Sequence, residues 1–393
     1  MRSGVLADLQ EAINVLSTGN GFIPDDHTQK AGSLNVLGLA FHIRFECLGD
    51  LADLDRAIAT QQQAVGFAPD NDPNKASYLT NLGNSFWKRF QRFGNLADLD
   101  IAIVAQQQAV DIRPNNHPDK AACFNNLGNA LLARFGHMSE LPDLDKAIAA
   151  QQQAVNITPD NHRGKSGYLN NLAISICHRF QRLGKLTDLD MAIVTLEQAV
   201  NLTPDNHPGK AVLLNSLGLS LQIRFEHLGE LTDLDKAIAA QQQNVYLTPD
   251  NYPNKAAYLN NLGGSLILRF NRLGELTDAD SAVTALQRAV QFTPNDHPDK
   301  ALHLNNFGLS FFRRFERLHE PGDLDMAITA QQAAVDTAPD NHSNKPGFLS
   351  NLGTSLGTRF EQVGVLADLD KAIMAQQHAV NLTTDDQPDK ATF

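Results

Sequence analysis

The chain has 393 residues, of which 42% are hydrophobic and 19% are charged, so its composition excludes a disordered polymer. Its formal net charge is −12, which argues against a nucleic-acid partner because such a partner needs a basic face. Three cysteines (Cys47, Cys123 and Cys177) are too few for a disulfide framework and lack the paired spacing of a zinc site.

The first residues leave no room for the apolar stretch of a signal peptide. No segment approaches 18 consecutive apolar residues, so no membrane span or membrane partner is expected. With few cysteines and no export signal, the sequence predicts a cytoplasmic location.

The tripeptide Asp-Leu-Asp, or a near copy, recurs every 45 residues. A fixed period of this size is typical of a solenoid. We predict a single solenoid domain over residues 1–393, with units starting near residues 8, 53, 98, 143, 188, 233, 278 and 323 and a partial unit at 368–393. In the first unit Gln10 replaces the second aspartate, which indicates a frayed N-terminal cap.

Each unit is predicted to be a helical hairpin, and residues 98–142 serve as the example. A first helix is expected from Asp98, as its N-cap, to about Arg113, where Pro114 stops it. A second helix is expected from near Pro118 to residues 136–140. Both helices carry apolar seams, so neighbouring hairpins must stack.

Two columns of small residues recur from unit to unit. The glycines cost about 1 kcal/mol each in a helix interior, so their recurrence predicts close contact with a crossing helix. The alanine column is Ala57, Ala102, Ala147, Ala192, Ala237, Ala282, Ala327 and Ala372, and the glycine column is Gly38, Gly83, Gly128, Gly218, Gly263, Gly308 and Gly353, with Ala173 in one unit.

The spacing of these residues resembles the tetratricopeptide repeat. The matching positions in one unit are Leu79, Leu82, Gly83 and Phe86, followed by Ala102, Gln106, Ala109 and Pro114. The resemblance implies an all-α fold, a right-handed α-solenoid of tetratricopeptide-like helical hairpins. The longer interval from Gly83 to Ala102 predicts that both helices are extended. A HEAT-like array is the alternative that the period alone allows.

The segment 204–208 with residues 214–218 is similar to the long repeats of kinesin light chains. It is more similar to fungal repeat arrays, some of which precede a caspase-like protease domain. That resemblance implies binding of proteins or peptides. We expect no enzymatic activity in this chain, because its residues form no recognisable catalytic set.

Glutamine occupies the position where the family usually has a bulky apolar residue. We expect it to be half-buried, with its amide needing a hydrogen-bond partner. The column is Gln61, Gln106, Gln151, Gln241, Gln331 and Gln376, with Leu16, Leu196 and Leu286 in the other units.

Two adjacent asparagine columns are the candidate binding site. A row of primary amides can pair with the main chain of an extended peptide in the concave groove. Equally, one column can bridge adjacent hairpins or cap carbonyls. The candidates are Asn81, Asn125, Asn126, Asn170, Asn171, Asn215, Asn260, Asn261, Asn305, Asn306 and Asn351; Thr80 and Ser216 interrupt the columns.

Three columns of charged or titratable residues are predicted to serve structure. The arginine before each recurring Phe, such as Arg89, is expected to pair with an Asp-Leu-Asp carboxylate rather than to attract an acidic partner. The lysine at each second helix start, such as Lys120, is expected to pair with an acidic residue of the adjacent unit. The turn histidines, such as His117, are expected to serve as turn and N-cap residues, not as metal ligands.

The sequence carries no recognisable catalytic set, phosphate-binding loop or cofactor motif. We therefore expect a protein-interaction scaffold that holds an extended peptide or helix of a partner. One alternative is the sensor arm of a larger protein with a caspase-like domain, because residues 368–393 stop within a hairpin. Another is a structural array that self-associates through its exposed C-terminal hairpin.

Overall fold

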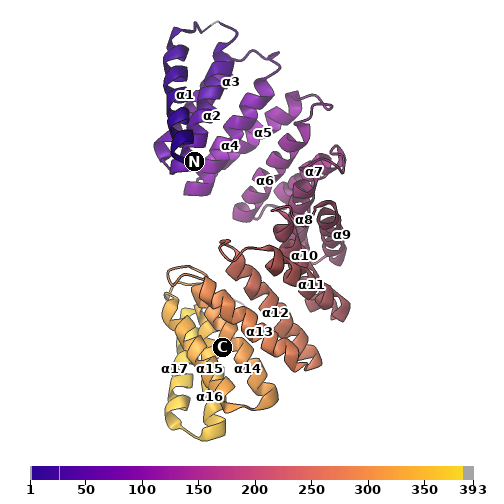
Figure 1. The fold of residues 1–393 in the computed structure, drawn as a ribbon, viewed down its shortest axis with the longest axis vertical. Coiled ribbons are helices and arrows are strands. Elements are labelled where there is room, and N and C mark those ends of the chain that lie inside the picture. Colours follow the sequence, from indigo (N-terminus) through magenta and orange to yellow (C-terminus); the bar gives the residue numbers. More distant parts are fainter. Residues whose placement is uncertain (1, 26, 384–393) are drawn as a thin grey trace. The chain divides into compact units, whose positions relative to one another are not determined.

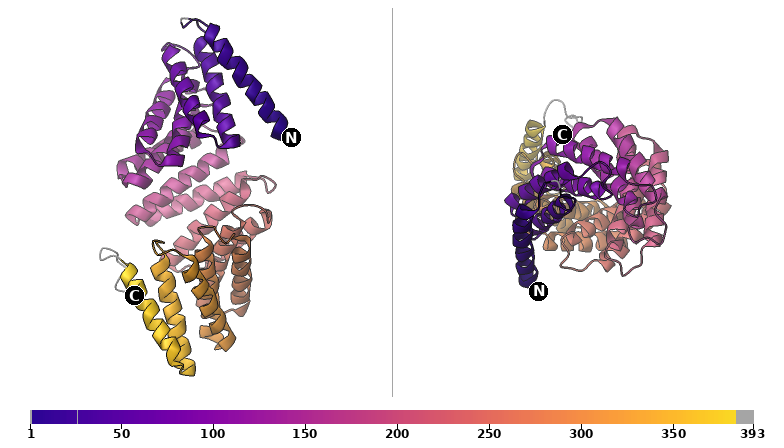
Figure 2. Two further views of the ribbon diagram at one scale, coloured as in Figure 1. Left: turned by 90° about the vertical axis from the view of Figure 1, so that its left-hand side faces the viewer. Right: turned by 90° about the horizontal axis from the view of Figure 1, so that it is seen from above.

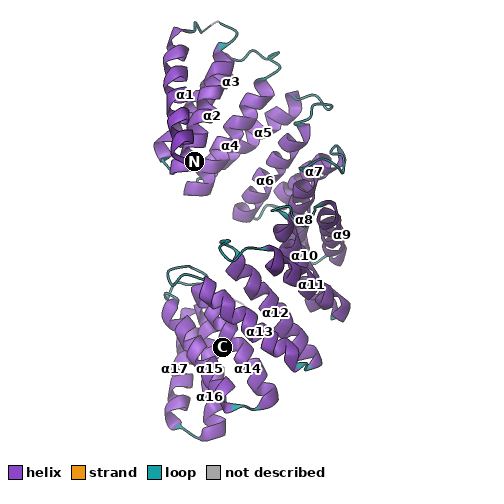
Figure 3. Ribbon diagram, in the orientation of Figure 1, coloured by secondary structure: helices purple, strands orange, loops and turns teal. Residues whose placement is uncertain are grey.

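The computed structural model describes residues 2–25 and 27–383, with side chains from residue 6 onward. The chain divides into two compact units, Met1–Leu202 and Thr203–Phe393. All regular structure in the described ranges is α-helical, and short turns join the helices (Figure 3). This confirms the predicted all-α solenoid of helical hairpins, while a single domain spanning both units stays a prediction.

The first unit contains nine described helices, which follow one another as stacked hairpins (Figure 1). They are α1 (Arg2–Phe22), α2 (Lys30–Leu48), α3 (Leu51–Phe67), α4 (Lys75–Phe93), α5 (Leu96–Ile112), α6 (Lys120–Met138), α7 (Leu141–Asn156), α8 (Lys165–Leu183) and α9 (Leu186–Leu202).

The second unit repeats this arrangement with eight helices in its described part. They are α10 (Lys210–Leu228), α11 (Leu231–Leu247), α12 (Lys255–Leu273), α13 (Leu276–Phe292), α14 (Lys300–Leu318), α15 (Pro321–Thr337), α16 (Lys345–Val363) and α17 (Leu366–Leu382). None of the helices in the described ranges is both long and apolar enough to cross a membrane.

Both helices of a hairpin are long and uninterrupted, as the sequence predicted. Helix α4 has 19 residues and α5 has 17. The predicted N-cap was wrong, however. The cap of α5 is Asn95, whose side chain accepts a hydrogen bond from the amide of Ala97. Asp98 lies within the first turn and is only 4% exposed, because it pairs with an arginine described below.

The even-numbered helices end in a left-handed residue. It is Gly94 after α4, with φ of 69°, and glycine adopts this conformation without the Cβ clash that other residues suffer. Two non-glycine residues take the same role: Ser139 with φ of 57° and His319 with φ of 55°.

The glycine column marks close helix contact, as predicted. A Cβ on Gly128 would lie 2.5 Å from Cγ of Gln151 and 3.1 Å from the carbonyl oxygen of Ala147. Ala147 itself has no exposed surface. The small residues of α6 and α7 therefore allow these helices to approach until the glutamine lies against bare backbone.

Within each unit the helices form two layers. Successive even-numbered helices, such as α4 with α6 and α12 with α14, contact one another across hairpins, whereas no two odd-numbered helices in the described part are in comparable contact. Figure 2 shows the same succession from two further sides. A stack whose one layer is more closely spaced curves toward that layer, so the even-numbered helices line the concave face of each unit.

Candidate functional site

The two asparagine columns pair with each other along the even-numbered helices. In the first unit Nδ2 of Asn81 on α4 donates to Oδ1 of Asn35 on α2 at 3.0 Å. Similarly, Asn171 on α8 donates to Asn125 on α6 at 2.9 Å. We call this row of paired amides the asparagine ladder. Each rung joins one hairpin to the next.

The second unit has three equivalent rungs. The donors Asn261, Asn306 and Asn351 pair with Asn215, Asn260 and Asn305 at 3.0, 2.9 and 3.0 Å. Every one of these contacts joins residues 46 positions apart. The ladder therefore follows directly from two adjacent columns with a 45-residue period.

One rung in the first unit departs from this pattern because Thr80 stands where the acceptor asparagine would be. Asn126 donates instead to Oδ1 of Asn84, one turn further along α4, at 3.3 Å. On α8, Oδ1 of Asn170 is buried without a hydrogen-bond partner among the described residues. The ladder thus includes Asn84, which the column pattern did not identify.

The donor asparagines keep unused hydrogen-bonding capacity. Asn81, Asn171 and Asn261 are half-buried, and their Oδ1 atoms have no partner among the described residues. Each also retains a second N–H. The acceptors Asn125 and Asn305 are more deeply buried, at 8% and 5% exposure. The acceptors therefore serve the bridge, while the donors hold an oriented acceptor and donor at the surface.

The glutamine column lies beneath the ladder and is more buried than predicted. Gln61, Gln151 and Gln241 are at most 1% exposed, because each packs its side chain against a glycine of the preceding helix. The prediction of half-burial was wrong for these residues; Gln376 on α17 is exposed.

Only some of these buried amides find partners. Nε2 of Gln106 donates to Oδ1 of Asn84 at 2.9 Å, and Nε2 of Gln151 donates to Oδ1 of Asn129 at 3.0 Å. Gln241 has no partner for either amide atom among the described residues. The difference follows from the sequence, since Leu219 stands where Asn84 and Asn129 stand in their hairpins.

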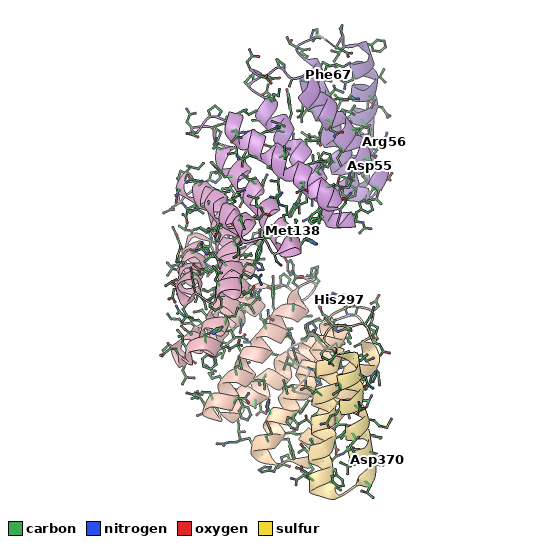
Figure 4. All side chains as sticks on the ribbon, turned by 180° about the vertical axis from the view of Figure 1, so that it is seen from behind. Asp55, Arg56, Phe67, Met138, His297 and Asp370 are labelled. Atoms are coloured by element: carbon green, nitrogen blue, oxygen red, sulfur yellow. The ribbon has the colours of Figure 1, made fainter. Side chains whose placement is uncertain are left out.

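An ion-pair network runs along one edge of each unit and confirms the predicted arginine role. Arg89 donates two parallel hydrogen bonds to Asp98 at 2.7 and 2.9 Å and a third, of 3.0 Å, to Asp55. It therefore joins α4 to α5 and also to α3, where Asp55 is labelled in Figure 4. The equivalent pairs are Arg44–Asp53, Arg134–Asp143, Arg179–Asp188, Arg224–Asp233, Arg269–Asp278, Arg314–Asp323 and Arg359–Asp368.

These pairs perturb the titration of their members in the expected directions. The hydrogen bonds that Arg134 donates to Asp143 raise the pKa of Arg134 above its ordinary value. Conversely, the hydrogen bond from Arg359 lowers the pKa of Asp368. Because the arginines pair with aspartates of this chain, the asparagine ladder is the remaining candidate for binding.

The lysine column has a different partner from the one predicted. Nζ of Lys165 donates to the carbonyl oxygens of Val155 and Thr158 at 2.8 and 2.7 Å, at the C-terminal end of the preceding helix. The acid that some of these lysines meet lies five residues earlier in the same turn, as Asp70 does for Lys75 at 2.7 Å. The predicted partner in an adjacent unit was wrong, because unpaired helix-end carbonyls attract the cation.

The turn histidines take the predicted turn role. Nδ1 of His117 accepts a hydrogen bond from the amide of Asp119 at 3.1 Å, and His162 and His342 accept in the same way. Within the described residues no group of His, Cys, Asp or Glu side chains is arranged to hold a metal ion. The three cysteines, all in the described part of the chain, form no disulfide; Cys123 is buried and Cys47 is exposed.

Comparison with known proteins gave structural neighbours only. No family model matches the sequence, and no curated protein does. Among solved structures, the nearly identical TPR-like repeats of a kinesin light chain from Podosopora anserina align at 16% identity and a TM-score of 0.41, covering 55% of this chain and 97% of that one.

Two further structures align over somewhat more of the chain. YrrB, described as a TPR protein with an unusual peptide-binding site, shares 18% identity at a TM-score of 0.39, covering 59% of this chain and 96% of its own. BtubC from P. vanneervenii shares 15% identity at a TM-score of 0.44, covering 61% and 88%. The hairpin geometry and the residue columns described above identify the chain itself as an array of tetratricopeptide-like helical hairpins.

Proposed function

We propose that this chain is a protein-interaction scaffold that binds an extended peptide along the asparagine ladder. The observation that carries the proposal is the unused capacity of the donor asparagines. Asn81, Asn171 and Asn261 are held in one orientation by their rungs and keep an unpaired side-chain oxygen at the surface. An oriented amide loses little conformational entropy when it binds, which favours affinity.

The spacing of the rungs suits a peptide main chain. Stacked helices lie about 8–10 Å apart. An extended chain rises about 3.3 Å per residue, so one rung meets about every third residue. Each amide can accept from one main-chain N–H and donate to one C=O. Binding of this kind is largely indifferent to the side chains of the peptide.

Substitution of the ladder tests this function. A peptide would first be selected from a random-sequence display library against the intact chain. Alanine at Asn81 and Asn171 should weaken its binding at least tenfold, because each loses an oriented amide. The matched control is Gln107→Ala, at an exposed site on α5 whose amide bonds only Asp111. If the asparagine variants lower the melting temperature but bind the peptide as tightly as the parent, the ladder is only a bridge between hairpins.

A second candidate function is self-association through the outward face of α17. Ile373 is 56% exposed there, whereas the equivalent Ile328 on α15 is 9% exposed. Asp370, labelled in Figure 4, has no ion-pair partner among the described residues, although the equivalent Asp325 pairs with Arg359. Light scattering over a concentration series tests this. Association that Ile373→Asp abolishes would support it, and a constant monomer mass would reject it.

A further inference from the structure

A cleft with three arginines in its walls lies in the second unit, at the C-terminal ends of α12 and α14. Its volume is about 490 Å³, and Asn271, Arg272, Arg313, Glu316 and Arg317 are among the residues that line it. None of these arginines belongs to the recurring Arg–Asp pairs described above. They are therefore available for another role.

The cleft is separate from the asparagine ladder. Asn271 lies ten residues after the ladder donor Asn261 on α12, which is about 15 Å along the helix axis. It also follows Leu266, which occupies the last position of this helix that the tetratricopeptide pattern specifies. The cleft is thus formed by the ends of the two helices, outside the positions that define the repeat.

Two of the three arginines have no partner of opposite charge. Arg272 and Arg317 are exposed, and neither forms a hydrogen bond or an ion pair with any described residue. Arg313 pairs with Glu316 of its own helix, with 2.8 Å between Nη1 and Oε2. One carboxylate in the walls therefore faces three guanidinium groups. Because the whole chain has a net charge of −12, this excess of positive charge is local.

The end of α12 holds one of these guanidinium groups in place. A Cβ on Gly274 would lie 3.0 Å from Nη2 of Arg317 and 3.4 Å from its Cζ, so the guanidinium lies against the bare backbone of this glycine. A guanidinium that is already positioned loses less conformational entropy when it binds an anion. The contact is particular to this hairpin. A Cβ would meet no atom within 4 Å at the equivalent glycines Gly49, Gly94, Gly184, Gly229 and Gly364.

The equivalent cleft of the first unit shows which group the second unit lacks. It lies between α2 and α4, has a volume of about 560 Å³, and is lined by Glu46, Lys88 and Arg92 among others. There the carboxylate of Glu46 on α2 lies 3.4 Å from Nζ of Lys88 on α4. In the second unit Asn271 takes the place of Glu46, and Arg313 takes that of Lys88. The cleft between α12 and α14 therefore keeps the cation but has no carboxylate at the position from which Glu46 joins the two helices.

A carboxylate supplied by another molecule complements these groups. Each guanidinium can donate two parallel hydrogen bonds to it, and the side-chain amide of Asn271 can donate one more. An ammonium group would meet like charge. An uncharged amide would gain little from the excess of positive charge.

We propose that the cleft between α12 and α14 binds a side-chain carboxylate from an acidic segment of a partner protein. The partner supplies to Arg272, Arg313 and Arg317 the group that Glu46 supplies within the first unit. Because the cleft is separate from the ladder, this inference goes beyond the peptide-binding function proposed above and does not depend on it.

Fluorescence anisotropy of a dye-labelled hexaglutamate peptide with the intact chain tests the cleft. The comparison probes are a hexaglutamine peptide with the same dye and inorganic phosphate at equal ionic strength. We expect saturable binding of hexaglutamate and at least tenfold weaker binding of hexaglutamine. No saturable binding of hexaglutamate, or equal binding of the two peptides, would overturn the proposal. Tighter binding of inorganic phosphate than of hexaglutamate would assign the cleft to a free anion and would also overturn it.

Two variants of the cleft and one matched control locate the binding. Asn271→Glu should weaken hexaglutamate binding at least tenfold, because it places a carboxylate of the chain where Glu46 stands in the first unit. Arg317→Gln should weaken it at least fivefold, because it removes a positioned guanidinium. The control is Arg92→Gln, the equivalent position on α4, which should leave the binding unchanged.

All three of these side chains are exposed, so the melting temperature of each variant should stay close to that of the parent. Undiminished hexaglutamate binding in Asn271→Glu would contradict the cleft. Equal weakening by Arg92→Gln and Arg317→Gln would show that the peptide responds to any surface arginine, and would contradict it as well.

The cleft and the ladder can fail separately. Asn261→Ala removes a ladder donor from α12 and should leave hexaglutamate binding unchanged. If this variant loses the peptide, the probe binds at the ladder and the cleft proposal fails. If hexaglutamate binding needs Arg317 while selected peptides ignore the ladder variants, the cleft stands and the ladder function fails.

Discussion

At the scale of the residue, buried polar side chains are the feature that distinguishes this array. His303 on α14 is 3% exposed, and its Nδ1 lies 2.8 Å from Oγ1 of Thr293. The threonine hydroxyl already donates to the carbonyl oxygen of Ala289, so the imidazole Nδ1–H donates to the threonine oxygen. This hydrogen bond places a proton on Nδ1 of His303 and orients the ring.

Burial lowers the pKa of His303 below its ordinary value near 6.5, although Asp299 opposes the shift. The unfolded chain therefore takes up a proton first as the pH falls through about 6.5. The contribution of His303 to the stability of the fold is fully present above that pH, and it declines until the pH drops below the folded-state pKa of the ring.

We expect the melting temperature of the parent to fall between pH 7.5 and pH 5.5. His303→Phe should show a smaller fall, since phenylalanine fills the equivalent position as Phe348. The melting temperature of the variant will still depend on pH to some extent, because burial also lowers the pKa of His42. Identical pH profiles for the parent and the variant would contradict this account.

A second prediction concerns the buried glutamines whose side-chain amides have no hydrogen-bond partner among the described residues. Gln241→Leu should raise the free energy of unfolding by about 1–3 kcal/mol, since it removes two buried polar atoms that have no partner. Leu286 fills the same position in the next hairpin at 1% exposure. Gln151→Leu is the control, and its gain should be smaller because it also breaks the bond to Asn129. Urea denaturation measures both; a loss of stability in Gln241→Leu would refute the argument.

At the scale of the element, the turn after each even-numbered helix decides how the hairpin closes. Ser139 adopts φ of 57° where most other hairpins have glycine. A residue with a Cβ is strained in this conformation by about 1–2 kcal/mol. Ser139→Gly should therefore stabilise the chain by about 1 kcal/mol.

The reverse substitution is available in the same unit. Gly184, with φ of 67°, should lose a similar amount when changed to serine. Thermal denaturation of the two single variants checks the pair. If both changes shift the melting temperature in the same direction, backbone strain is not the cause.

The elements also show what the sequence could predict. The hairpins, their extended helices and the Arg–Asp pairs were predictable, because each depends on residues that recur with one period. The partners of the lysines were not predictable, because they are main-chain carbonyls at a helix end, and every residue type carries such a carbonyl. Burial of glutamines such as Gln151 was underestimated, since it depends on how closely Gly128 admits the crossing helix.

The same distinction, between what the repeat period predicts and what depends on packing, holds for the candidate site. The asparagine columns could be read from the period, but their mutual pairing could not, because it depends on how adjacent hairpins stack. Asn84 and Asn129 were missed because their column holds asparagine in these two hairpins only and other residues elsewhere, such as Leu219. A position that departs from its column is a signal that could have singled them out.

At the scale of the whole molecule, each unit has an edge whose arginines and aspartates pair with one another, and a face whose asparagines keep unused hydrogen-bonding groups. The arginines and aspartates are satisfied by one another, and the lysines and turn histidines by main-chain groups. The donor asparagines retain hydrogen-bonding capacity on the concave layer. The central claim is therefore that the ladder binds peptide main chain rather than particular side chains.

The most direct measurement is a backbone N-methylation scan of a peptide selected against the intact chain, since N-methylation removes one main-chain N–H at a time. Isothermal titration calorimetry would give the affinity of each methylated peptide. The ladder account predicts losses of about tenfold that recur roughly every third residue, as the rung and strand spacings require. Affinity that ignores N-methylation but collapses on side-chain substitution throughout the peptide would contradict it.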